Sequence, residues 1–275
     1  MSGSVPERSS SNGGGRETTA AVWAAVSGLT IGEAWLQRDD PKAPELVAKY
    51  QHAVEQLGRG VPFAYAVGRA AFRTLDLTID ARALIPRPET EGLVDLVLAR
   101  VQGGVVADVG TGSGCIALSL AVEGRFDRVI AVERSPAAAA LARENVALVR
   151  PRTPVEIREG DLLAPLAGQR YRAIVANPPY LTEDEYAALA PAVKEFEPRD
   201  ALVSGPDGLA ASRALLAGAA ALLEPGGVLA LEIDERRSDT VRALAHQAGW
   251  GRIDVHDDLF GRPRYALVKT ASEDE

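Results

Sequence analysis

Residues 105–122 read VVADVGTGSGCIALSLAV, an apolar run followed by a glycine-rich turn and then by residues of helical character. The run 105–109 predicts a short buried strand, and residues 115–122 predict the helix that follows it. Glycines at alternate positions of the turn let the backbone approach a ligand where a Cβ would intrude. A strand, a glycine turn and a helix in this order predict a ligand cradle at the edge of an α/β sheet.

The chain beyond this stretch alternates β-rich runs with helical segments. Further strands are expected at residues 128–132, 173–176 and 228–233. Further helices are expected at residues 136–146, 208–223 and 236–248. Such alternation indicates parallel strands covered by helices on both faces. Residues 253–255 and 265–268 flank a Gly-Arg-Pro turn, which predicts an antiparallel hairpin at the sheet edge.

The chain before the sheet divides into segments of different composition. A Ser- and Gly-rich start without the apolar core of a signal peptide predicts a disordered tail. Apolar positions at helical spacing then predict a small helical domain with Trp23, Trp35 and Tyr50 in its core, before an alternating run that predicts a hairpin. We expect a disordered tail at residues 1–16 and a helical N-terminal domain that docks substrate at residues 17–70. A linker hairpin should follow at residues 71–85, and the sheet domain at residues 86–275.

The composition of the 275 residues limits the possible functions. With 47% hydrophobic residues but no uninterrupted apolar stretch of about 18, the chain predicts a globular, cytoplasmic protein without a membrane span. The formal net charge of -8 gives no general attraction for phosphates, so nucleic acid is an unfavoured partner. We separately expect a monomer. Cys115 is the only cysteine, which excludes an internal disulfide and a thiolate zinc cluster, so no metal is expected.

The glycine turn combines with a carboxylate on the next strand. Glu133 ends that strand, where a carboxylate can accept hydrogen bonds from both hydroxyls of a ribose. The candidate nucleoside site consists of Asp108, Gly110, Thr111, Gly112, Ser113, Gly114 and Glu133. A tight turn that binds no ligand is the plain alternative.

A nicotinamide dinucleotide is a second alternative for this site. Its usual Gly-x-Gly-x-x-Gly spacing is absent, and Asp108 occupies a strand end that is usually apolar in dinucleotide-binding folds. A nucleoside cofactor without a pyrophosphate fits better. Asp161 and Leu162 follow a third strand-like run, where they could line the adenine pocket, although Asp161 equally suits an ordinary turn.

Asn177-Pro178-Pro179-Tyr180 follows another predicted strand, at the carboxyl edge where ligands bind in open α/β sheets. Two prolines remove two backbone donors and fix two φ angles, so the loop is rigid and presents carbonyl groups. The side-chain oxygen of Asn177 and the carbonyl of Pro178 could each accept one N–H of a planar amide or amine, with Tyr180 stacked on it. We therefore expect a site for a weakly nucleophilic nitrogen, without a Ser-His-Asp arrangement.

These motifs together resemble the seven-stranded amino methyltransferases, which include DNA adenine N6-methyltransferases and protein glutamine methyltransferases. Residues 84–91 (LIPRPETE) and 197–199 (EPR) resemble a narrower family, the release-factor glutamine methyltransferases of the HemK or PrmC type. The similarity covers residues 59–269. It implies a Rossmann-like class I fold and S-adenosyl-L-methionine as the cofactor, with S-adenosyl-L-homocysteine as its product. It also implies that Asn177 contacts the cofactor.

The resemblance implies N5-methylation of the glutamine in the Gly-Gly-Gln loop of peptide chain release factors. It makes Asn177, Pro178 and Tyr180 catalytic, and it makes these residues and Pro179 substrate-binding. The chain departs from the family in its short N-terminal unit and in Asp234, where glycine is common. A ribosomal-protein glutamine methyltransferase, a DNA adenine N6-methyltransferase and a catalytically silent binding module are the alternatives.

Overall fold

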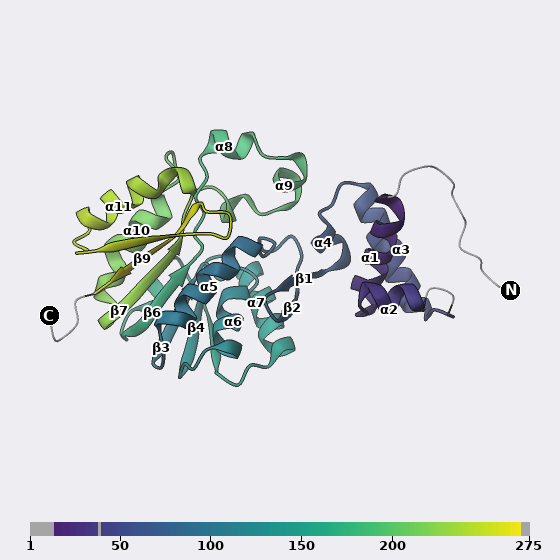
Figure 1. Cartoon of the computed structure of the whole chain (residues 1–275), viewed down its shortest axis with the longest axis horizontal. Coiled ribbons are helices and arrows are strands. Elements are labelled where there is room, and N and C mark those ends of the chain that lie inside the picture. Colours follow the sequence, from purple (N-terminus) through teal and green to yellow (C-terminus); the bar gives the residue numbers. More distant parts are fainter. Residues whose placement is uncertain (1–13, 38–39, 271–275) are drawn as a thin grey trace. The chain divides into compact units, whose positions relative to one another are not determined.

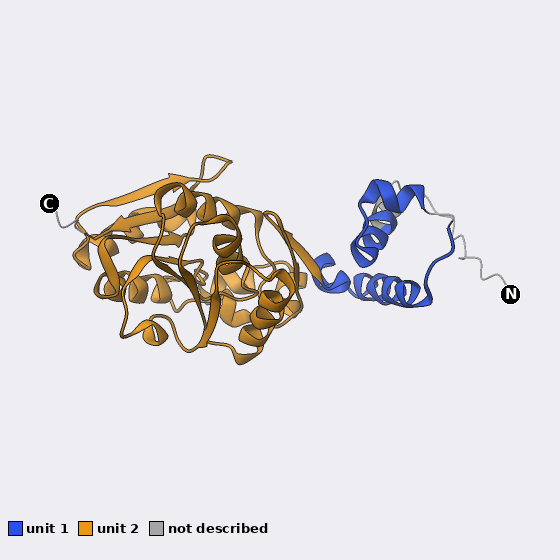
Figure 2. Ribbon diagram, turned by 90° about the horizontal axis from the view of Figure 1, so that it is seen from below, with its two compact units in different colours: residues 1–68 blue, residues 69–275 orange. Residues whose placement is uncertain are grey.

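The computed structural model describes residues 14–37 and 40–270, which form two units that divide between Gly68 and Arg69 (Figure 2). Residues 1–13, most of the segment expected to be a tail, lie outside the described residues, and the first helix begins at Gly14. None of the described helices is long and apolar enough to cross a bilayer.

The N-terminal unit is helical. Its helices are α1 (Gly14–Ser27), α2 (Ile31–Leu36), α3 (Pro44–Gly58) and α4 (Phe63–Val67). The rings of Trp23 and Tyr50 pack with centroids 5.7 Å apart, which joins α1 to α3. Trp35 is 59% exposed, so the expectation that it belongs to the core of this unit is wrong. Helix α2 is too short to bury a complete apolar face.

The second unit is built on a seven-stranded sheet, which confirms the predicted α/β class (Figure 1). In spatial order its strands are β5 (Val155–Glu159), β4 (Arg128–Glu133), β3 (Val105–Val109), β6 (Tyr171–Ala176), β7 (Leu223–Glu232), β9 (Pro263–Lys269) and β8 (Ile253–Asp257). The strands from β5 to β7 are parallel, whereas β9 is antiparallel to both of its neighbours. The hairpin expected at the sheet edge is therefore confirmed.

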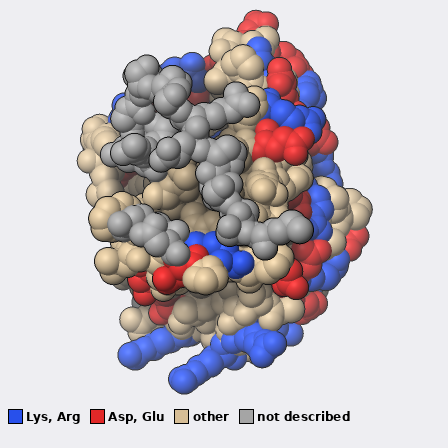
Figure 3. Space-filling model, turned by 90° about the vertical axis from the view of Figure 1, so that its right-hand side faces the viewer, with Lys and Arg blue, Asp and Glu red and all other residues tan. Residues whose placement is uncertain are grey.

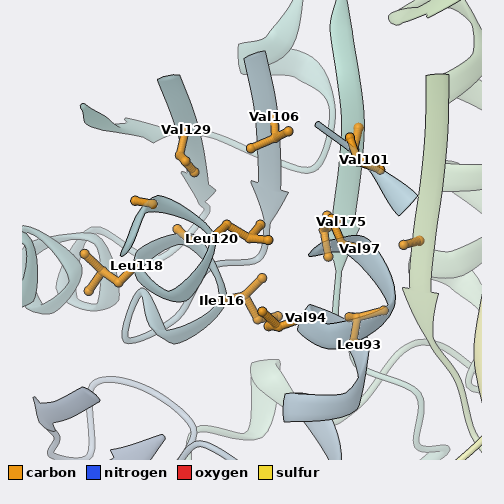
Figure 4. Packing of buried hydrophobic residues seen from close by; sticks show 14 of the residues in the cluster. Leu93, Val94, Val97, Val101, Val106, Ile116, Leu118, Leu120, Val129 and Val175 are labelled. Atoms are coloured by element: carbon orange, nitrogen blue, oxygen red, sulfur yellow. The ribbon is translucent and has the colours of Figure 1, made fainter. Parts of the chain in front are cut away.

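Helices cover both faces of the sheet. They are α5 (Pro88–Arg100), α6 (Cys115–Glu123), α7 (Pro136–Val149), α10 (Ala210–Gly218) and α11 (Ser238–Gln247), with the short α8 (Glu183–Ala187) and α9 (Pro191–Phe196) in a connection. Figure 4 shows the core on one face, where Val94 of α5 and Ile116 of α6 lie below Val106 of β3. The other face buries residues of α10 and α11, among them Leu215 and Val241.

Two predicted helices are shorter than expected. Helix α10 gives way to a 3-10 turn at Ala219–Ala221, because strand β7 already begins at Leu223. Helix α11 begins at Ser238, since the side chain of Asp234 caps a 3-10 turn at Glu235–Arg237. Asp234, the departure from the family pattern, thus caps the turn that leads into α11.

The hairpin of β1 (Arg69–Phe72) and β2 (Leu75–Thr78) belongs to the second unit. Buried Asn145 of α7 ties it to the glycine turn. Its Oδ1 accepts from the Thr78 amide (2.8 Å), and its Nδ2 donates to the carbonyls of Thr78 (2.9 Å) and Ser113 (2.9 Å). The segment expected to be only a linker therefore supports the turn.

Candidate active site

A cavity of about 820 Å³ opens at the carboxyl edge of the parallel strands. The predicted site residues that line it are Gly110, Thr111, Gly112, Ser113, Glu133, Asp161, Leu162, Asn177 and Pro179. The structure thus brings the glycine turn, the carboxylate of the next strand and the Asn-Pro-Pro-Tyr loop to one cavity. Four predicted residues are not in its wall: Asp108, Gly114, Pro178 and Tyr180.

The glycine turn is held open by its backbone conformation. Gly110 (φ 76°), Gly112 (φ 56°) and Gly114 (φ 86°) all lie in the left-handed region, which a side chain would strain. The amides of Gly110 and Thr111 donate to the carbonyl of Val132 at 2.9 and 3.0 Å, which fastens the turn to β4. A Cβ added at Gly110 would meet no atom within 4 Å, so this backbone borders open space.

Asp108 holds the turn from within the protein. Its buried Oδ2 accepts from the Thr111 hydroxyl (2.5 Å) and from the amide of Ala117 (3.0 Å), while Oδ1 has no hydrogen-bond partner among the described residues. Burial raises the pKa of this carboxyl to about 7, although the Thr111 hydrogen bond opposes the shift. Asp108 therefore shapes the cradle and start of α6 instead of lining the cavity.

Glu133 reaches across the same turn from the end of β4. Its Oε2 accepts from the amide of Gly112 (2.9 Å), and its Oε1 accepts from the amide of Ser135 (2.8 Å). Each carboxylate oxygen has a further lone pair, so Glu133 can accept two more hydrogen bonds from a ligand in the cavity. The two hydroxyls of a ribose are donors of this kind, and the site thus fits a nucleoside.

Asn177 belongs to a hydrogen-bonded chain that sequence reasoning missed. Its Nδ2 lies 3.0 Å from Oγ1 of Thr90, and the Thr90 hydroxyl donates to Oε2 of Glu232 at 2.7 Å. A threonine has a single hydroxyl hydrogen, and an ionised carboxylate only accepts. While Glu232 is ionised, Thr90 must therefore accept from Asn177, which leaves the Asn177 Oδ1 as the free acceptor.

Glu232 is a carboxylate within the sheet. It is 1% exposed, and burial raises its pKa to about 7, against the hydrogen bond from Thr90 and the positive charges of Arg264 and Arg87. In the sequence, only the position of this glutamate within the apolar run of strand β7 could have indicated a buried carboxylate. Its partner Thr90 lies 142 residues away, and no local pattern indicates that contact.

Two other residues of the Asn-Pro-Pro-Tyr loop are packed into the protein, whereas Pro179 lines the cavity. Pro178 is buried and Tyr180 is half-buried. Burial raises the pKa of the Tyr180 phenol to about 12, so the phenol stays neutral. A Cβ at Gly208 (φ 73°) would lie 2.4 Å from the carbonyl oxygen of Tyr180, so glycine is needed there for the two segments to approach.

A fourth carboxylate, Glu197, joins two loops that contribute to the cavity wall. Glu197, only 5% exposed, accepts from Nη2 of Arg87 at 2.6 and 2.7 Å and from the amide of Ile85 at 3.4 Å. Both segments were recognised in the sequence by their resemblance to a family, but their contact was not predicted. The pair fixes residues 85–87 and 198 in the cavity wall.

Cys115 also lines the cavity, next to the turn. Burial raises the pKa of its thiol to about 12, so it is not a thiolate near neutral pH. Among the described residues no group of three or more His, Cys, Asp or Glu side chains is arranged to hold a metal ion.

Comparison with known proteins agrees with this geometry. Residues 89–196 match the family model described as "Methyltransferase small domain". A crystal structure of a methyltransferase from Pyrococcus furiosus has the same fold, with a TM-score of 0.56 and 20% identity over 74% of this chain and 91% of that one. The fold and the site define an S-adenosylmethionine-dependent class I methyltransferase.

The curated relatives are more specific. A release factor glutamine methyltransferase of Moorella thermoacetica is 42% identical over 86% of this chain and 84% of its own length. The protein of the same name from Deinococcus radiodurans is 41% identical over 90% of this chain and 88% of its own length. The chain belongs to the release factor glutamine methyltransferase family.

Proposed function

We propose that this protein transfers the methyl group of S-adenosyl-L-methionine to the side-chain amide nitrogen, N5, of the glutamine in the Gly-Gly-Gln motif of peptide chain release factors. The observation that carries the proposal is the Asn177–Thr90–Glu232 chain, which leaves a fixed amide oxygen beside a nucleoside-sized cavity. Membership of the family supports the choice of substrate.

The cofactor would be held by the glycine turn and Glu133, with Glu133 accepting from the ribose hydroxyls. Asp161 and Leu162 would border the adenine from the wall of the cavity. When bound, S-adenosyl-L-methionine supplies an activated methyl group on a sulfonium. The chain itself therefore has to bind, orient and exclude water, and no nucleophilic side chain is required.

The substrate amide needs acceptors because its nitrogen lone pair is delocalised into the carbonyl. We propose that Asn177 Oδ1 and the Pro178 carbonyl each accept one N–H of the glutamine and stabilise positive charge that develops on the nitrogen. Pro179 borders the same cavity. The contact of the Pro178 carbonyl with the amide and the stacking of Tyr180 on it stay predictions, since neither residue is in the cavity wall.

The helical N-terminal domain is proposed to dock the release factor, at residues 17–70 as expected from sequence. A monomer in the cytoplasm, with no nucleic-acid partner, also stays a prediction. On the face seen in Figure 3, acidic and basic side chains are intermixed along the right-hand side, and basic side chains project at the lower edge.

A methyl-transfer assay tests the proposed function. Purified release factor, unmethylated DNA and ribosomal proteins are incubated side by side with the enzyme and S-adenosylmethionine labelled in its methyl group. We expect label in the release factor only. Label in DNA or in a ribosomal protein, with none in the release factor, would replace the proposal with one of the alternatives.

A further inference from the structure

The turn between β8 and β9 presents two large apolar side chains to solvent. Leu259 is 102% exposed and Phe260 is 74% exposed. This turn is the yellow end of the β8–β9 hairpin nearest to α5 in Figure 1. Two adjacent apolar side chains held in solvent on one turn form a small apolar patch, the kind of surface that a binding partner can cover.

The turn is well braced. Oδ1 of Asp258 accepts from the amides of Phe260 (2.9 Å) and Arg262 (3.1 Å), and the amide of Asp258 donates to the Arg262 carbonyl (2.8 Å). Gly261, with φ 75°, closes the turn by donating to the Asp258 carbonyl at 3.0 Å. A braced turn loses little conformational entropy when its side chains are buried by a partner.

The turn is anchored beside the active site. Asp258 pairs with Arg264 at 3.4 Å, and both side chains are largely buried. The Arg264 carbonyl accepts from Ile233 (2.8 Å), and the next residue, Tyr265, pairs in register with Glu232 of the Asn177 chain. The apolar pair therefore stands on the same edge of the sheet as the proposed methyl-accepting position.

The surroundings of the pair have the anatomy of a small protein interface. Arg262 lies over the Phe260 ring, with its guanidinium carbon 5.8 Å from the ring centroid, and it pairs with Glu235 at 3.6 Å. An apolar centre with a charged rim that is already neutralised suits a protein surface. A lipid surface would be favoured by unpaired basic groups instead.

We propose that Leu259 and Phe260 form a docking tip that inserts into an apolar patch of the substrate protein, next to the loop that carries its glutamine. This inference rests on the proposed function and adds a contact site for the release factor. A glutamine in a loop offers little surface of its own, so contacts outside the cavity have to supply affinity. The tip does so without touching the cofactor or the reacting amide.

The test is a kinetic comparison with full-length protein and intact release factor. The double variant Leu259→Ser/Phe260→Ser should raise KM for release factor about tenfold or more, because it removes the apolar centre of the contact. Its kcat, its melting temperature and its affinity for S-adenosylhomocysteine should stay close to the unmodified enzyme. Leu148→Ser is the matched control, since Leu148 is 54% exposed at the end of α7 on the opposite edge, and it should leave KM unchanged.

An unchanged KM in the double variant would overturn the proposal. So would sedimentation showing that the unmodified enzyme is a dimer and the double variant a monomer, because the tip would then bind a second copy. Binding of only the unmodified enzyme to phosphatidylglycerol vesicles would overturn it as well. If the unmodified enzyme does not methylate release factor at all, the proposed function fails first, and the two failures are thereby distinguished.

Discussion

Asn177 is useful only if its amide oxygen, and not its amide nitrogen, faces the substrate. The rotation is set by Thr90, which receives the Asn177 N–H at 3.0 Å while donating to Glu232. An asparagine without such partners could present either group. Methyl transfer by the proposed route therefore depends on two side chains, Thr90 and Glu232, that do not themselves react.

Substitution of Thr90 by valine tests this orientation. Valine keeps the shape but neither accepts from Asn177 nor donates to Glu232, so the amide is free to turn. We expect kcat in the release-factor assay to fall about 10- to 100-fold, less than the roughly 100- to 1000-fold loss on removing a hydrogen bond to the reacting atoms, because Thr90 acts through Asn177. Calorimetry should show little change in S-adenosylhomocysteine affinity, and Thr90→Ser should restore most of the rate. Equal loss of rate and cofactor affinity would contradict a role in orientation.

The same chain predicts a pH dependence. The pKa of Glu232 is raised to about 7 by burial, which the positive charges of Arg264 and Arg87 oppose and the negative charge of Glu89 reinforces. Protonated Glu232 no longer requires the hydrogen of Thr90, so Thr90 can donate to the Asn177 oxygen and occupy it. We expect kcat to fall as the pH drops through about 7, and Glu232→Gln to lose this acid limb. A limb that persists in the variant would assign it to another group.

The free energy of unfolding should change with pH in the opposite direction to kcat. A carboxyl whose folded pKa lies above its ordinary value of 4.5 contributes stability that is present below that value and is lost as pH rises through about 7. Glu232→Gln removes this titration. In denaturant unfolding, we compare the free energy of unfolding of the variant with that of the unmodified protein. The variant's value minus the unmodified protein's value should be larger at pH 8 than at pH 5. The same difference at both pH values would contradict the sign. Asp108, with a pKa also raised to about 7, should supply the remaining slope.

At the scale of elements, two loops from distant parts of the chain form one wall of the cavity. The segment before α5 and the segment after α9 are joined by Arg87 and Glu197, whose side chains are 34% and 2% exposed. Removing either partner of such a pair leaves the remaining charge without compensation for its desolvation. This pair therefore differs from the many exposed ion pairs of the molecule.

Charge removal at two carboxylates measures that difference. In Glu197→Ala, Arg87 and the amide of Ile85 lose their acceptor, and the wall loosens. We expect a loss of about 2 kcal/mol in the free energy of unfolding, reduced from the fully buried case because Arg87 is partly exposed. Glu144→Ala breaks the exposed Arg82–Glu144 pair and should cost below about 1 kcal/mol. Similar losses of unfolding free energy in both variants would show that the Arg87–Glu197 pair stabilises the protein no more than an exposed ion pair does.

At the scale of the whole molecule, much of the architecture could be predicted from the sequence. Parallel strands are buried on both faces and therefore appear as apolar runs, and the glycine turn and Asn177 loop follow such runs directly. Contacts between distant segments, such as Thr90 with Glu232 and Arg87 with Glu197, could not be predicted from the sequence. Asp108 was expected in the ligand site, but position along the chain does not show which way a carboxylate at a strand end points.

The division into two units leads to a prediction for a truncated protein. Every residue that lines the cavity belongs to the second unit, from Arg69 onward. Residues 69–275 alone should therefore bind S-adenosylhomocysteine with an affinity within about threefold of the full chain, a difference of about 0.7 kcal/mol. Calorimetry on both proteins measures this, with circular dichroism as the control for folding. A folded fragment that does not bind would mean that the first unit contributes to the cofactor site.

The most direct test of the central claim is mass spectrometry of the release-factor peptide that contains Gly-Gly-Gln, after incubation with S-adenosylmethionine and either the unmodified enzyme or Asn177→Ala. We expect one added methyl on the glutamine side-chain nitrogen with the unmodified enzyme, and no detectable methyl with Asn177→Ala, although this variant should still bind S-adenosylhomocysteine. Methylation of the same nitrogen at an equal rate by Asn177→Ala would contradict it, because the fixed amide oxygen would then have no part in the transfer.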